Sequence, residues 1–154
     1  MTLSELREEI SIELEMMEST VRESTSLLNE LSAREPTIRE KTAAGAFLAQ
    51  FYGGIENILK RVHRYHNVPI PTGETWHTDI FKRFCTPAYT PFFVLFDESL
   101  AVELSPFRKF RHVVYHGYGF QLDWERIKEG LKMVETVHTR FVLSVSNYTA
   151  KLNS

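Results

Sequence analysis

The sequence has little cysteine, no long apolar run and no excess of one charge. Cys85 is the single cysteine, so an internal disulfide is excluded and we expect a cytoplasmic protein. The longest apolar run, residues 92–96, is far too short to span a bilayer, so we expect no membrane partner. The first residues are acidic and lack the apolar segment of a signal peptide.

The charges nearly balance, but they are unevenly distributed. The chain has 18 basic and 20 acidic side chains, for a net charge of −2. Residues 1–35 carry −6 and the remainder carries +4. A protein that coats RNA by electrostatics alone would be strongly basic. The balance therefore favours recognition of one local site, on a surface away from the first helix.

The 154 residues, 43% of them hydrophobic, are expected to form a single domain over 1–154. Apolar residues recur at threes and fours over long stretches, which predicts helices. The patterns Thr2-x-x-Glu5 and Thr37-x-x-Glu40 are capping boxes. They predict the starts of two long helices, which extend to about residue 33 and about residue 65.

The second half of the chain predicts one short helix and two more long ones. The short helix is expected over about 74–84, and Asp97 and Asp123 are expected to cap the long ones. Pro106 lies inside the first of these and is expected to kink or break it. Residues 86–96 are expected to form an extended connection or a short strand. The predicted fold is an all-α, antiparallel up-and-down four-helix bundle with an additional short helix.

Two segments have the pattern Arg-x-x-x-x-His, namely Arg61 to His66 and Arg111 to His116. Arginine binds phosphate through a planar, permanently charged fork of donors, and histidine exchanges protons near neutral pH. Such a pair suits metal-free cleavage of RNA. Residues five apart on an ideal helix are rotated by about 140°, so the two side chains would not share a face. They would converge if the helix unwinds near His116, or across the two-fold axis of a dimer.

The context of the two segments differs. Arg61 and His66 precede an ordinary helix exit, and we interpret them as a solvated helix end. Arg111 and His116 run into a glycine-flanked tyrosine, Tyr118. Periodicity alone favours a structural pair even for Arg111 and His116. Three further polar side chains accompany this second segment: Arg108, Lys109 and His112.

Other candidate residues are weaker. Glu56 lies in a mostly apolar stretch, where it is either a buried partner for an arginine or a flank residue; the flank is slightly favoured. Trp76 and His77 are interpreted as a packed aromatic residue with a structural histidine. The histidines lack the spacing of metal ligands, and no glycine-rich phosphate loop is present. We therefore expect no metal site and no cofactor.

The block from Arg111 to Tyr118 resembles the signature of HepT-like proteins in the HEPN superfamily. That signature is Arg, four residues, His, any residue, Tyr. Residues 51–61 (FYGGIENILKR) resemble the family's second helix, and residues 71–77 (PTGETWH) resemble its Pro-x-Gly-x-x-Trp-His turn. The pieces follow the family's order and cover about residues 40–130. This combination is more specific than the short motif, and it favours a functional Arg111 and His116.

The resemblance implies a HEPN-like bundle that forms a homodimer, with the two motifs meeting in a cleft. It implies the toxin of a toxin–antitoxin system, a metal-independent endoribonuclease that acts on RNA such as tRNA or mRNA. It also implies a partner, a small MntA-type nucleotidyltransferase antitoxin that attaches AMP to Tyr118. Pro106, just before the motif, departs from what the family's catalytic helix leads us to expect.

Under this interpretation Arg111 and His116 are catalytic, and His112 and Tyr118 support them. Arg108 and Lys109 are candidate RNA-binding residues. The alternative comes from another functional class, a non-catalytic HEPN binding module associated with a nucleotidyltransferase. In such a module Arg111 and His116 would hold a nucleotide or an interface and would cut nothing.

Overall fold

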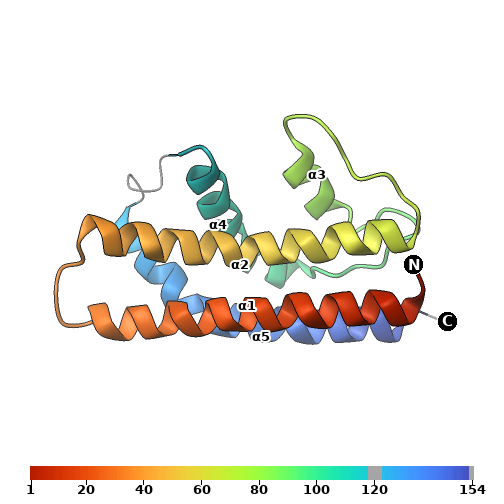
Figure 1. Cartoon of the computed structure of the whole chain (residues 1–154). Coiled ribbons are helices and arrows are strands. Elements are labelled where there is room, and N and C mark those ends of the chain that lie inside the picture. Colours follow the sequence, from red (N-terminus) through yellow and green to blue (C-terminus); the bar gives the residue numbers. More distant parts are fainter. Residues whose placement is uncertain (118–122, 153–154) are drawn as a thin grey trace.

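The computed structural model describes residues 1–117 and 123–152, and these residues form helices and no strand (Figure 1). The predicted all-α class is therefore confirmed. The predicted boundaries of the helices are close to those observed. The helices are α1 (Leu3–Leu31), α2 (Ile38–Tyr65), α3 (Trp76–Lys82), α4 (Glu98–Tyr115) and α5 (Trp124–Ala150).

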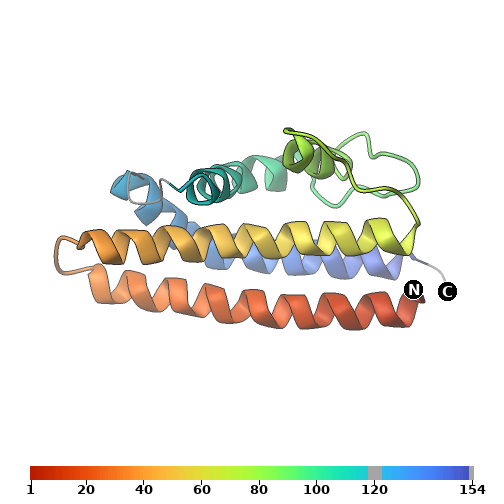
Figure 2. The ribbon, with the colours of Figure 1, turned by 45° about the horizontal axis from the view of Figure 1, so that its top comes forward.

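The four long helices alternate in direction and form an up-and-down bundle, as predicted (Figures 1 and 2). Helix α2 lies between α1 and α4, and α5 contacts all three of them. The short helix α3 packs on α2, on the same side as α4. The C-terminal end of α4 and the start of α3 therefore lie over one face of α2. The site described below forms there.

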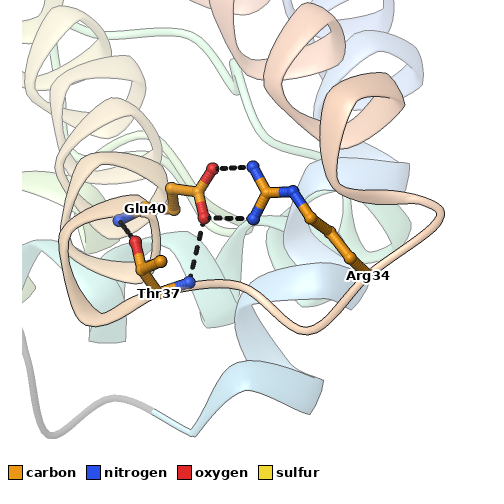
Figure 3. A network of polar contacts seen from close by, with 3 residues as sticks. All are labelled: Arg34, Thr37 and Glu40. Carbon is orange, nitrogen blue, oxygen red and sulfur yellow. Dashed lines mark hydrogen bonds and ion pairs between the residues drawn. The ribbon is translucent and has the colours of Figure 1, made fainter.

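Both predicted capping boxes are present, and the second one fixes the turn between α1 and α2 (Figure 3). The Thr37 side chain accepts from the backbone N–H of Glu40, whose carboxylate accepts from the Thr37 N–H. Arg34 donates to both oxygens of the same carboxylate, at 2.7 and 2.5 Å. These bonds, the arginine's first, lower the pKa of Glu40 to about 2. One charged group thus joins the end of the turn to the start of α2.

The connection between α3 and α4 was expected to be extended, but it is an irregular loop of turns and bends, which packs on the bundle. Phe92 and Phe96 are buried in it, and their rings stack on those of Phe84 and Phe81 at centroid distances of 4.5 and 4.4 Å. The expected alternative of a short strand does not occur among the described residues. This aromatic cluster fixes α3 against the rest of the core.

Helix α4 continues through Pro106, so the break that the sequence suggested does not occur. Proline removes one backbone hydrogen bond, which leaves the carbonyl four residues earlier without its N–H partner. Here that carbonyl belongs to Val102, whose side chain is 69% exposed, and Pro106 is exposed as well. Water can therefore bond the freed carbonyl, and the helix remains continuous up to the motif.

Candidate active site

The sequence motif lies at the C-terminal end of α4, where the backbone leaves the helix. Tyr115 is the last helical residue, and His116 caps the helix with φ −88° and ψ 8°. Gly117 follows with φ +81°, a left-handed conformation that glycine adopts without strain. The helix therefore ends at this glycine. Gly119 and Tyr118 lie outside the described residues.

Arg111 is held on three sides. Its Nε forms an ion pair with the Glu56 carboxylate of α2. The carbon of its guanidinium lies 4.0 Å from the centroid of the Tyr115 ring, one turn later on α4. A Cβ on Gly53 would lie 3.1 Å from its Nη1, so the absence of a side chain there gives the guanidinium its space. The side chain of Arg111 is only 17% exposed, so its position is well defined.

Glu56 is buried, and the preferred interpretation of it as a flank residue was wrong. Its side chain is 1% exposed and faces Arg111. The sequence of α2 alone does not reveal that α4 packs over this residue. Burial raises the pKa of Glu56, and the positive charge of Arg111 offsets part of that rise. One turn earlier, the Tyr52 hydroxyl is also buried and has no hydrogen-bond partner among the described residues. Helix α2 thus contributes a buried carboxylate and a buried hydroxyl to the site.

Three histidines line the same pocket as this arginine. The rings of His112 and His116 have centroids 4.2 Å apart, one turn apart at the end of α4. The third, His77, comes from α3, and its ring lies 6.3 Å from that of His112. Burial lowers the pKa of His77, and the positive charges of the neighbouring groups on α4 lower it further.

Sequence reasoning had assigned His77 a purely structural role and so missed its place beside the motif. The signal was present, because His77 ends one of the segments that resemble the HepT-like pattern. Nothing in the local sequence, however, indicates that α3 lies beside the end of α4.

The arginine and the three histidines line one pocket of about 1020 Å³ between α2, α3, α4 and α5. The pocket is lined by four basic and three acidic side chains besides the histidines, and most of the rest of its lining is apolar or aromatic. Arg111 and His116 therefore line the same pocket of one chain. The helix does not unwind between them, because the His116 N–H still bonds the His112 carbonyl oxygen at 3.2 Å. The other predicted residues that line it are Arg108, Lys109 and His112.

The other Arg-x-x-x-x-His segment is a structural element. Arg61 pairs with Glu13 and Glu9 of α1, at 3.2 and 3.7 Å, and its side chain is 24% exposed. The His66 ring packs against Tyr65 and Phe92, with centroids 4.9 and 5.6 Å away. The segment was expected to be solvated, but the partly buried Arg61 joins α2 to α1.

The described part of the chain shows no group of three or more histidine, cysteine, aspartate and glutamate side chains that could hold a metal ion. Among the same residues, no helix combines the length and the apolar character needed to cross a membrane.

Comparison with known proteins identifies a family. A family model described as "HepT-like protein" matches residues 43–152, which include α3, α4, α5 and most of α2. No curated protein matches this sequence, and no solved structure matches it. The matched segment covers more than two thirds of the chain and contains every residue of the pocket. The chain belongs to the HepT-like family.

Proposed function

We propose that this protein is the toxin of a HEPN-type toxin–antitoxin system and acts as a metal-independent endoribonuclease. One observation carries the proposal: a guanidinium fixed by a buried carboxylate shares a pocket with histidines that can transfer protons. Membership of the HepT-like family supports it. The single domain over residues 1–154 is part of the same proposal.

In the proposed reaction, a ribose 2′-hydroxyl attacks the adjacent phosphate of RNA. Arg111 binds the phosphate oxygens and stabilises the negative charge of the pentacoordinate transition state. Glu56 pairs with Nε, so it sets the orientation of the fork and leaves the terminal nitrogens for the ligand. Because the arginine is already positioned, little conformational entropy is lost when the phosphate binds.

His116 transfers a proton in this reaction. It caps α4 and is exposed to the pocket, so a substrate can reach its ring. His112 supports it from one turn earlier, with ring centroids 4.2 Å apart. Arg108 and Lys109 line the same pocket and are proposed to contact the RNA backbone through their charge.

The protein is proposed to act as a homodimer. The spacing of Arg111 and His116 no longer requires a second chain, since both residues line one pocket. The dimer is proposed from the family and from exposed apolar side chains around the pocket. Val102 and Tyr115 are each 69% exposed and Met133 is 37% exposed, so a second copy would cover apolar surface there.

The proposed regulation acts through Tyr118, which a small MntA-type nucleotidyltransferase antitoxin would modify with AMP. Tyr118 follows His116 by two residues, so an attached AMP would add bulk and a negative phosphate beside Arg111. Tyr118→Phe should keep much of the ribonuclease activity and escape modification. Intact-mass analysis after co-expression with the nucleotidyltransferase measures this, with Tyr115→Phe as the control that still becomes modified. AMP on Tyr115 or Tyr89, or no added mass at all, would refute the assignment.

The ribonuclease proposal is tested by incubating the purified protein with total RNA, with and without EDTA. We expect cleavage in both samples, with products that end in a 2′,3′-cyclic phosphate. Arg111→Ala should remove the activity. RNA binding without cleavage would support the non-catalytic binding module instead, and cleavage that requires added Mg²⁺ would contradict the proposed site.

A further inference from the structure

His77, the third histidine of the pocket, lies on α3, whereas the motif lies on α4. Contacts between α3 and its surroundings hold it in place. The Arg83 side chain, at the C-terminal end of α3, lies 3.0 Å from both the His63 Nε2 and the Pro69 carbonyl oxygen. Trp76 begins α3, and the ammonium group of Lys60, from α2, lies 4.5 Å from the centroid of its ring. Helix α3 is thereby attached to α2 at both ends. These contacts hold His77, directly after Trp76, near the end of α4.

We propose that His77 is a second proton-transfer residue of this site, so that a single chain supplies both the base and the acid for RNA cleavage. The inference rests on the proposed ribonuclease function and deepens it. Its geometric basis is the 6.3 Å between the ring centroids of His77 and His112, and the 4.2 Å between those of His112 and His116. Arg111 lines the same pocket, so a phosphate bound to it would share that pocket with imidazole groups from two helices.

The charges around His77 assign its role. From α4 it faces His112, His116, Arg111 and Arg108, which are cations or can become cations. From α2, Lys60 lies over the adjacent tryptophan, and Glu56 is paired with Arg111. On its own helix, Asp79 accepts a hydrogen bond from Thr75 at 3.0 Å.

Burial and these positive neighbours lower the pKa of His77, which favours the neutral form of its imidazole. A neutral imidazole accepts a proton, and His77 is therefore the base. His116, exposed at the helix end, is the acid.

The step balances within one chain. A ring nitrogen of His77 takes the proton of the ribose 2′-hydroxyl while the 2′-oxygen forms a bond to phosphorus. The bond between phosphorus and the 5′-oxygen of the next nucleotide breaks, and that oxygen takes a proton from the imidazolium of His116. The products are a 2′,3′-cyclic phosphate and a 5′-hydroxyl. Arg111 holds the phosphate throughout.

The first experiment compares RNA with uridine 3′-(4-nitrophenyl phosphate), whose leaving group needs no acid. His77→Gln should lower kcat on the order of 10²–10⁴-fold on both substrates, because both need the base. His116→Gln should lose far more on RNA than on the activated ester. The acidic limb of the pH–rate profile should also disappear in His77→Gln. His66→Gln, from the other Arg-x-x-x-x-His segment, is the control that retains full activity.

The second experiment mixes chains and tests whether the pair acts within one of them. A His77→Gln chain mixed with a His116→Gln chain should stay inactive, while wild type mixed with the double variant should keep activity in proportion to the wild-type chains. Recovery in the first mixture would overturn the single-chain pair. Full activity of a folded His77→Gln protein, while Arg111→Ala and His116→Gln are inactive, would overturn the inference alone. Cleavage by all three variants would overturn the proposed function itself.

Discussion

The two Arg-x-x-x-x-His segments of this chain have the same spacing and opposite surroundings. In both, the arginine forms an ion pair with a glutamate of a neighbouring helix. Arg61 pairs with Glu13 of α1, and Arg111 pairs with Glu56 of α2. The histidines differ more. His66 lies against aromatic side chains, and its Nε2 is buried without a hydrogen-bond partner among the described residues. His116 is exposed to a pocket and has a second imidazole beside it.

The difference teaches that the motif acquires a possible chemistry from what surrounds it. A histidine that cannot reach a ligand cannot transfer a proton to it, whatever its pKa. An arginine whose fork is shared between Glu9 and Glu13 has little capacity left for phosphate. The predictions that follow test this contrast, from the largest expected effect to the smallest.

The largest effect is expected on catalysis at the two histidines. His116→Ala should lower the rate of RNA cleavage on the order of 10²–10⁴-fold, because it removes the proposed proton-transfer group. His66→Ala should leave the rate of the folded protein unchanged, since its ring lies outside the pocket. The measurement is single-turnover cleavage of RNA by purified variants, with circular dichroism to verify the fold. Equal losses in the two variants would remove the contrast.

A large effect on stability is expected at the buried pair of Arg111 and Glu56. Arg111→Met leaves the carboxylate buried without its partner, which should cost about 3–5 kcal/mol of unfolding free energy. The double variant Arg111→Met/Glu56→Gln should recover much of that loss, because the unpaired charge is gone. It should remain inactive, because Arg111, the proposed phosphate-binding residue, is absent as well. Urea unfolding together with an RNA cleavage assay separates the two effects.

The loss in Arg111→Met should also depend on pH. Burial raises the pKa of Glu56, so the folded state binds its proton more tightly than the unfolded chain does. The loss of unfolding free energy is therefore fully present above the pKa of Glu56 in the folded variant. It falls as the pH decreases toward the ordinary pKa of glutamate. Urea unfolding at about pH 5 and about pH 8 should show the smaller loss at the lower pH. A loss that does not vary with pH would mean that the carboxylate finds another partner.

The smallest effect is expected at Arg61. Arg61→Met should reduce the unfolding free energy by about 1–3 kcal/mol, since it breaks a partly buried pair between α1 and α2. It should leave RNA cleavage by the folded protein intact. Arg22→Met is the matched control, because Arg22 pairs with Glu18 on the exposed surface of α1 and should contribute little. A fall in cleavage rate for folded Arg61→Met would place this segment in the functional site.

The fold could be predicted from local signals because each helix carries its own. Thr2 and Thr37 mark the starts of α1 and α2, and the spacing of apolar residues gives the buried faces. At Pro106 the sequence predicted a kink or a break, and the break does not occur, because the effect of a proline depends on where the freed carbonyl points. That direction follows from packing of the whole helix.

The site could be predicted only in part. Arg111 and His116 could be named because the motif is contiguous in sequence, and both line the pocket. The burial of Glu56 and the place of His77 in the pocket could not be predicted, because both depend on helices far away in the chain. Which residue of α2 faces α4, and where α3 lies, are tertiary facts that a single sequence does not display.

Gly53 places helix stability and ligand binding in conflict at one position. Within a helix, alanine is more favourable than glycine by about 1 kcal/mol, so an alanine at residue 53 would favour α2 by itself. Its methyl group would take space that the guanidinium of Arg111 now occupies, and Glu56 and Tyr115 leave that group little room to yield. An alanine at this position would thus gain helix propensity but strain the pair of Arg111 with Glu56, and it would displace the proposed phosphate-binding group. Glycine at residue 53 therefore gives up helix propensity and leaves the guanidinium of Arg111 in its place between Glu56 and Tyr115.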